Sequence, residues 1–298
     1  MCGIVGLLVK TPSMRDQLGE LMLPMLIGMS ERGPESAGLA VFTEPVAADH
    51  RKFSVYTVVE AAGWDEFTLA AKRDLGGDTT VTAQANHAVV LTSALPGSVK
   101  AWLARHYPAH HLLSIGQSID LYKDTGTPAE VAQRYHFSEL QGSHLVGHTR
   151  MATETAVTPA RAHPFTAGED FCLVHNGSLS NPNTVRRKLE PRGIVFETDN
   201  DTEAACRFLE WRMREGDCLE SALEKGFDEL DGFYTLLMGT RNELALVRDA
   251  FSCKPAIVAE TDDYVAISSE FRSLAKLPGV KNATLFEPNP EQIYLWRT

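Results

Sequence analysis

A cysteine stands at the second position of the chain, directly before the short apolar run of MCGIVGLLVK. The run GIVGLLV predicts a buried strand that begins directly after Cys2, because a short apolar run of this kind suits a core strand. If Met1 is removed, Cys2 carries both a thiol and a free α-amine, whose pKa of about 7.7 to 8.0 lets it serve as the base for its own thiol. Taken alone, however, a cysteine at this position is more often an ordinary buried residue.

The composition excludes several classes of protein. The chain has 298 residues, of which 44% are apolar and 22% charged, enough for one large domain with a sizeable core. A formal net charge of -11 argues against broad nucleic-acid binding, and no stretch approaches the ~18 uncharged apolar residues of a membrane span. The first residues lack the basic segment and the cleavage site of a secretory signal. Five cysteines without CxxC or zinc spacing favour a cytoplasmic protein and predict no metal site.

The order of the expected elements indicates an α+β fold. Strands, then helices, then strands follow one another without regular βαβ alternation, which favours stacked sheets over a doubly wound sheet. Residues from about 45 to 140 give the weakest pattern. They include His106, His110 and His111, which we interpret as solvated surface histidines because no carboxylate or cysteine flanks them at ligand spacing. We predict a single domain over residues 2–298, with an insertion at about 45–140.

Three further features suit the hydrolysis of an amide, and each also has an ordinary structural explanation. In HNG at 175–177, Asn176 and Gly177 offer a side-chain amide and a backbone N–H to a developing oxyanion, although Asn-Gly is also a strong turn signal. Arg150 in GHTRMAT has the forked geometry that binds a carboxylate, or it forms a surface salt bridge. Asp201 in TDNDTE binds an ammonium group, or it caps the helix that follows.

Five motifs occur in one chain and in a fixed order: MCGIVG, RGPESAGLAVF, GHTRMAT followed by AHPF, VHNGSLSN and TDNDTE. Together they resemble the glutaminase domain of the class II glutamine amidotransferases, which include amidophosphoribosyltransferase, glucosamine-6-phosphate synthase, asparagine synthetase and glutamate synthase. The resemblance covers nearly the whole chain except about 45–140. It implies an N-terminal nucleophile hydrolase fold, which is a four-layer αββα sandwich of two antiparallel sheets between helical layers.

The resemblance also implies roles for individual residues. Cys2 would be the nucleophile after removal of Met1, with its own amine as the base, and Asn176 and Gly177 would form the oxyanion hole. The substrate-binding group that it implies consists of Arg150 for the α-carboxylate of glutamine, Asp201 for the α-ammonium, Gly177 in the pocket wall, Arg32 beside the nucleophile, and His163. We expect Arg32 to support the pocket, and His163 and His175 to be structural rather than catalytic.

The chain departs from the family pattern at two places near these residues. Met151 stands where the glucosamine-6-phosphate synthase branch has an aromatic residue, which concerns the lid over glutamine and not the chemistry. Two aspartates, Asp199 and Asp201, compete for the ammonium. We prefer Asp201 because DTE continues into the helix as the family pattern does.

The resemblance finally implies partners. No synthase domain follows the glutaminase motifs, so we expect the ammonia acceptor to lie on another chain and the protein to form a hetero-oligomer. The nearest resemblance is to the amidotransferase subunit of split glutamate synthase-like enzymes such as N-methylglutamate synthase. FMN and an iron–sulfur cluster would then belong to partner subunits, and this chain itself would hold no cofactor, since it has neither a cysteine cluster nor a GxGxxG motif after a strand.

Two alternative functions stay open at this point. The first is an N-terminal nucleophile hydrolase of another amide, which the pair of Arg150 and Asp201 argues against because that pair requires a free amino acid. The second is a glutamine-sensing or assembly subunit without turnover. The presence of Cys2, Asn176 and Gly177 together argues against it.

Overall fold

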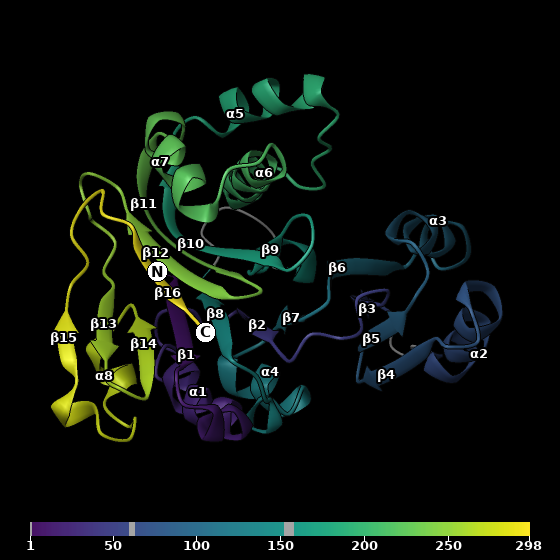
Figure 1. The fold of residues 1–298 in the computed structure, drawn as a ribbon, viewed down its shortest axis with the longest axis horizontal. Coiled ribbons are helices and arrows are strands. Elements are labelled where there is room, and N and C mark those ends of the chain that lie inside the picture. The colour runs from purple at the N-terminus through teal and green to yellow at the C-terminus, as the bar shows by residue number, and fades with distance from the viewer. Residues whose placement is uncertain (1, 60–62, 152–157) are drawn as a thin grey trace.

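The computed structural model describes residues 2–59, 63–151 and 158–298. Their strands form three antiparallel sheets of seven, five and four strands, and the two larger sheets are stacked between helices (Figure 1). Among the residues in these ranges, no helix is both long and apolar enough to cross a membrane.

The seven-stranded sheet has strand β1 at its centre, in the order β15-β13-β14-β1-β8-β2-β7. Its strands are β1 (Gly3–Val9), β2 (Ser36–Phe42), β7 (Ile119–Thr125), β8 (His144–Arg150), β13 (Ile257–Glu260), β14 (Tyr264–Ser268) and β15 (Thr284–Phe286). Strand β1 pairs along both edges, with β14 and with β8, and is buried over its whole length. The strand predicted from GIVGLLV is thus confirmed, and it is a central strand.

The second sheet has five strands in the order β16-β12-β11-β10-β9. They are β9 (Phe165–Thr166), β10 (Phe171–Leu179), β11 (Gly232–Thr240), β12 (Glu243–Arg248) and β16 (Tyr294–Arg297). Helices α5 (Pro182–Leu189), α6 (Asp201–Arg214) and α7 (Leu219–Glu229) cover its outer face (Figure 1). Helices α1 (Leu18–Ile27), α4 (Pro128–Arg134) and α8 (Phe271–Leu274) pack on the outer face of the first sheet. This layer order confirms the predicted four-layer αββα sandwich.

Alternate residues of β1 pack into two different cores, because successive side chains of a strand point to opposite faces. Ile4 and Leu8 lie between the two sheets. Val5, Leu7 and Val9 pack on the other face, together with the apolar side of α1. The strand is therefore apolar at consecutive positions because it is covered on both faces.

Residues 51–116 form a separate unit beside the sandwich (Figure 1). Its elements are β3 (Arg51–Thr57), α2 (Trp64–Leu75), β4 (Thr80–Gln84), β5 (His87–Thr92), α3 (Pro96–His106) and β6 (His110–Gly116). The four strands form their own sheet in the order β4-β5-β3-β6, and Phe53, Phe67 and Trp102 lie in its core. The range predicted as an insertion, about 45–140, contains this unit, and it also contains β7, which pairs with β2, and α4, which packs on the sandwich.

One histidine of this unit differs from its predicted environment. His106 and His111 are exposed, whereas the ring of His110 stacks on Phe67 at a centroid distance of 5.2 Å and meets Trp64 edge-on. Burial lowers the pKa of His110. The interpretation of His110 as a solvated histidine is therefore wrong, because its aromatic partners come from α2, which is distant in the sequence.

Asp170 connects this separate unit to the sandwich. Its carboxylate accepts hydrogen bonds of 3.0, 2.8 and 3.1 Å from the backbone N–H groups of Gln117, Ser118 and Ile119, between β6 and β7. The guanidinium of Arg241 adds an ion pair at 2.7 Å. Asp170 is only 5% exposed. Loss of the carboxylate would leave three buried donors without an acceptor.

We expect the substitution Asp170→Ala to lower the free energy of unfolding by about 3 to 5 kcal/mol, because buried donors and a charged partner lose their acceptor. Arg241→Ala is the matched control and should cost about 1 kcal/mol or less, since its guanidinium is partly solvated. Urea unfolding followed by circular dichroism measures both. Equal losses for the two variants would contradict the role given to the backbone N–H groups.

Candidate active site

Cys2 is held by its backbone at the start of β1. Its carbonyl oxygen accepts a hydrogen bond of 3.0 Å from Nε of Arg32, and Nη1 of Arg32 lies 3.3 Å from a carboxylate oxygen of Glu270. The side chain of Arg32 is buried, so it supports the backbone of Cys2 from below the surface. The thiol of Cys2 is unpaired and half-buried. Met1, whose removal the sequence predicts, lies outside the described residues.

Strand register places Arg150 beside Cys2. Strands β1 and β8 are antiparallel with Gly3 opposite Thr149, so the next position in the same register sets Cys2 opposite Arg150. The turn that carries Arg32 packs against the end of β8 beside Arg150. The backbones approach so closely that a Cβ on Gly33 would lie 2.3 Å from the carbonyl carbon of Thr149. Only a glycine permits this approach between the two backbones.

The guanidinium of Arg150 lies near a short loop that follows in the sequence. Its Nη1 donates a hydrogen bond of 3.1 Å to the carbonyl oxygen of Arg161. Arg161 in turn forms an ion pair of 3.1 Å with Asp199. The prediction for the lid concerns Met151, and residues 152–157, which follow it, lie outside the described residues.

Asn176 faces the same inter-sheet space as Cys2. In β10, Cys172 and Val174 pack between the two sheets, so the side chain of Asn176 points to the same face two residues later. Ile4 of β1 packs in this same core, and the two strands lie against each other. The amide nitrogen of Asn176 is buried and has no hydrogen-bond partner among the described residues. Such a buried, unpaired donor costs about 1 to 3 kcal/mol unless a ligand accepts from it.

Gly177 lies within a strand rather than in a turn. Strand β10 pairs with β11 through Gly177 and on to Leu179, so the alternative prediction of a turn after a strand is wrong. Gly177 has φ of +141°, and a Cβ there would lie 2.0 Å from the carbonyl oxygen of Phe233. The backbone of its cross-strand neighbour, Tyr234, is directed to Asp249 instead. The N–H of Tyr234 donates to the Asp249 carboxylate at 2.8 Å, and its carbonyl oxygen accepts from the N–H of Asp249 at 3.0 Å, which leaves the N–H of Gly177 unclaimed by Tyr234.

Asp201 is the first residue of α6 and lies at the end of β10. The helix cap is Asn200, whose side chain accepts a hydrogen bond of 2.8 Å from the N–H of Thr202. The alternative prediction of Asp201 as the cap is therefore wrong. One oxygen of Asp201 accepts from the N–H of Leu179 at 2.9 Å, and the other lies 3.7 Å from Nδ1 of His175.

The two aspartates of TDNDTE have different environments. Burial raises the pKa of Asp201, but His175 and the backbone N–H groups of Leu179 and Thr202 outweigh burial and lower the pKa to about 2. Asp201 is therefore an anion at neutral pH. Asp199, by contrast, is 69% exposed at its side chain and is already paired with Arg161.

Three histidines and one threonine form a buried cluster behind these residues. Nε2 of His148 donates a hydrogen bond of 3.1 Å to the carbonyl oxygen of His175, and the ring of His148 stacks on that of His163 at 4.1 Å. Nε2 of His163 and Nδ1 of His175 both lie within hydrogen-bond distance of the hydroxyl of Thr202, at 2.8 and 3.1 Å. Burial lowers the pKa of His148 to about 3 and that of His163 well below its ordinary range.

We predicted that His163 is structural rather than catalytic, and its position in the fold agrees with that role. It is 5% exposed, so its ring lies under the site rather than at its surface. Sequence reasoning missed His148 and Thr202 altogether. His148 lies two residues before Arg150 in the same strand, and strand alternation was the signal that would have placed it on the same face.

Together, these residues offer a nucleophile, two hydrogen-bond donors and a pair of opposite charges. The thiol belongs to Cys2, the donors to Asn176 and Gly177, and the charges to Arg150 and Asp201. This set matches an amide whose other end carries an α-carboxylate and an α-ammonium group. Within the described ranges, no three His, Cys, Asp or Glu side chains are arranged to hold a metal ion.

Comparisons with known proteins agree with this chemistry. A family model described as a glutamine amidotransferase domain matches residues 148–276. The glutamine amidotransferase-like protein GlxB of Rhizobium meliloti (strain 1021) is 46% identical over 99% of this chain and 98% of its own length. A putative glutamine amidotransferase of Methanothermobacter thermautotrophicus is 28% identical over 99% of both chains.

A solved structure supports the fold. The glutamine phosphoribosylpyrophosphate amidotransferase from B. subtilis aligns with 99% of this chain at a TM-score of 0.62 and 19% identity. The present chain spans 49% of the length of that structure. At this identity the likeness concerns the fold alone, and it is the N-terminal nucleophile hydrolase fold of two stacked antiparallel sheets.

We expect the stability of the protein to fall steeply as the pH drops below about 6.5. His148, with a folded pKa of about 3, and His87 and His144, each with a folded pKa of about 4, stay neutral when folded. An unfolded histidine has a pKa near 6.5, so between these values the unfolded state binds more protons and each group costs about 1.4 kcal/mol per pH unit. Urea unfolding at pH 7.5 and at pH 5.5 measures the unfolding free energy at each pH. The difference should be about 1.4 kcal/mol for each of these three histidines.

A pair of variants isolates one contribution. His148→Gln should make the dependence of unfolding free energy on pH shallower by about one proton. His136→Asn is the control, because His136 is exposed and its positive φ of 49° suits asparagine. An unchanged slope in His148→Gln would show that His148 is not held neutral by the fold.

Proposed function

This chain belongs to the class II glutamine amidotransferase family, and from that premise we propose that it hydrolyses glutamine through a thioester on Cys2. Sγ of Cys2 attacks the side-chain carbonyl carbon of glutamine, and the free α-amine left by removal of Met1 takes the thiol proton. The same amine returns the proton to the leaving ammonia. Water then attacks the thioester, which releases glutamate and restores the thiol.

One observation carries this proposal. The buried amide nitrogen of Asn176 has no partner among the described residues, and it faces the same space as Cys2. The N–H of Gly177 is the second donor. Together they would receive the oxygen that becomes negative when the thiolate attacks, and such a donor contributes about 3 to 4 kcal/mol of transition-state stabilisation.

The charged residues would select a free amino acid. We propose that Arg150 binds the α-carboxylate and Asp201 the α-ammonium of glutamine, since they lie at the ends of β8 and β10 and Asp201 is ionised. Gly177 would form part of the wall between them, where a larger residue is excluded by Phe233. We propose that Arg32 and His163, both buried, position the backbone and the helix start rather than contact glutamine.

We further propose that the ammonia passes to an acceptor held by a partner subunit in a hetero-oligomer in the cytoplasm. We propose a partner of the glutamate synthase-like class, such as the flavin-containing subunits of N-methylglutamate synthase-like enzymes, because the chain resembles the amidotransferase subunit of such split enzymes. FMN and an iron–sulfur cluster would then reside on those subunits, and this chain would bind none.

The same residues also separate glutamine hydrolysis from the two alternative functions. A glutamine-sensing or assembly subunit would bind glutamine but leave Cys2 unreactive. A hydrolase of another amide would have no use for the charges of Arg150 and Asp201. The unpaired donor of Asn176 favours turnover, because two donors aimed at one oxygen stabilise a negatively charged oxyanion more than a neutral carbonyl oxygen.

We expect a diazo-ketone analogue of glutamine to label the protein once. The carbon that bears the diazo group bonds to Sγ of Cys2 and dinitrogen leaves, so intact mass should show loss of Met1 and a single adduct. Cys2→Ala should give no adduct, whereas Cys253→Ala, at an exposed unpaired cysteine, should label as the wild type does. Retained Met1 or labelling of Cys2→Ala would contradict the proposed nucleophile, and a processed but unreactive thiol would favour the sensor.

The two aspartates provide a second test of substrate recognition. Asp201→Asn should raise the analogue concentration that gives half the maximal labelling rate by about 10- to 100-fold, because a hydrogen bond to a charged group is lost. The maximal labelling rate should change little. Asp199→Asn should leave both values unchanged, since Asp199 pairs with Arg161 at the surface. A larger effect from Asp199→Asn would reverse the assignment of the ammonium site.

A further inference from the structure

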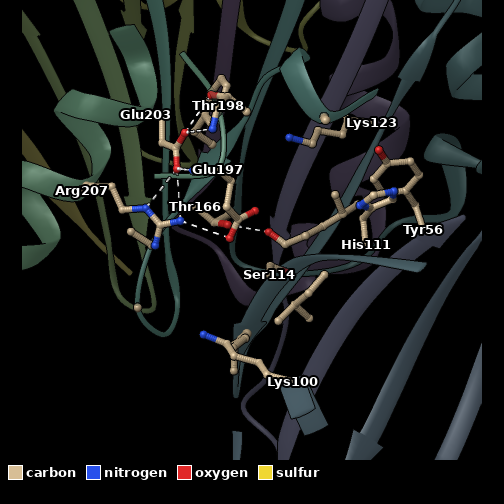
Figure 2. Close-up of a pocket in the computed structure, with 17 residues that line it drawn as sticks. Tyr56, Lys100, His111, Ser114, Lys123, Thr166, Glu197, Thr198, Glu203 and Arg207 are labelled. Atoms are coloured by element: carbon tan, nitrogen blue, oxygen red, sulfur yellow. Dashed lines mark hydrogen bonds and ion pairs between the residues drawn. The ribbon is translucent and has the colours of Figure 1, made fainter. Parts of the chain in front are cut away.

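A cavity of about 280 Å³ lies between the separate 51–116 unit and the sandwich (Figure 2). Strand β6, helix α3 and Tyr56 line one side, and β9, the segment before α6 and α6 itself line the other. Cys2, Asn176, Arg150 and Asp201 are not among its lining residues. Its size is near the lower end of the range for ligand pockets, about 300 to 1,000 Å³, so it suits a small molecule.

Lys123 of β7 is a buried cation in the wall of this cavity. Its Nζ donates hydrogen bonds of 2.9 and 3.2 Å to the carbonyl oxygens of Ala162 and Pro164, and it lies 5.0 Å from the ring centre of Phe165. Among the described residues, it forms no ion pair with a carboxylate. Buried charges are ordinarily paired, because their removal from water is costly. Burial accordingly lowers the pKa of Lys123 to about 8.

The nearest acids of the cavity are already engaged. Both oxygens of Glu203 accept hydrogen bonds, at 2.9 Å from the N–H of Glu197 and at 2.7 Å from the N–H of Thr198. Arg207 forms ion pairs of 3.3 Å with Glu203 and 3.4 Å with Glu197. Arg207 offsets one of these two carboxylate charges. Because Lys100 and Lys123 also line the cavity, its wall carries three cations and two carboxylates, and one positive charge remains.

The wall of the cavity also contains a polar group that has no hydrogen-bond partner among the described residues. The hydroxyl of Ser114 on β6 is buried and makes no hydrogen bond with the described residues. Figure 2 shows the ammonium of Lys123 directed into the space between the rings of Tyr56 and His111 and the pair of Glu203 and Arg207. The ring of Tyr56 is stacked between His111 at 4.9 Å and His87 at 5.7 Å, so the exposed ring of His111 is the one that offers an aromatic surface to the cavity.

We propose that this cavity is a binding site for a small organic carboxylate with a flat apolar body. The carboxylate pairs with Lys123 and accepts a hydrogen bond from Ser114, and the body lies against the exposed ring of His111. The site is separate from the proposed glutamine site and does not depend on it.

Binding of 4-fluorobenzoate to the full chain, followed by its ¹⁹F resonance, tests the proposal directly. The probe should bind one site with a dissociation constant of about 1 mM or below. 4-Fluorobenzamide has the same shape without the charge and should bind at least about 10-fold more weakly. Equal binding of the two probes, or no binding of 4-fluorobenzoate at about 10 mM, would overturn the proposal.

Variants place the probe in the cavity. Lys123→Met keeps the length of the side chain and should weaken binding of 4-fluorobenzoate by about 10- to 100-fold. Lys100→Met is the matched control, since Lys100 also lines the cavity but is exposed and should change affinity by less than about 3-fold. If Lys123→Met does not fold, Ser114→Leu fills the cavity instead and should abolish binding. Wild-type affinity in Ser114→Leu would show that the probe binds elsewhere.

Discussion

The pairing of β1 on both of its edges is the constraint on which the rest of the site depends. Because β14 and β8 both pair with it, β1 cannot shift along its axis without breaking two ladders of hydrogen bonds. The first paired residue is Gly3, so Cys2 projects from the end of a fixed strand. A reactive group at a chain terminus would otherwise be among the most mobile parts of a protein. Arg32 completes the arrangement with its bond to the carbonyl oxygen of Cys2.

Much of the sandwich was readable from the sequence because its strands are covered on both faces. Continuous apolar runs such as GIVGLLV and SAGLAVF can only be buried strands of a layered fold, and both are strands here. The site residues were readable as a set for a different reason. Each belongs to a short motif at one end of a strand or at the start of the helix after it, so register brings distant motifs to one end of the sheets.

What the sequence did not reveal depends on contacts between distant segments. Asn-Gly at 176–177 has the chemistry of a turn, yet pairing with β11 keeps it in a strand, with a backbone shape that only glycine tolerates. The burial of His110 requires α2, and the cluster of His148, His163 and Thr202 joins three segments that have no common pattern.

The connection between β2 and β7 determines how the extra unit relates to the fold. Phe42 pairs with Ile119, and the N–H of Thr43 bonds to the carbonyl oxygen of Ser118 at 2.9 Å. The chain therefore leaves and re-enters the sandwich across a single rung of an antiparallel ladder, which is the geometry of a hairpin. The whole 51–116 unit occupies the place of a tight loop. Homologous chains can enlarge, shrink or replace it while the order of the core strands stays the same.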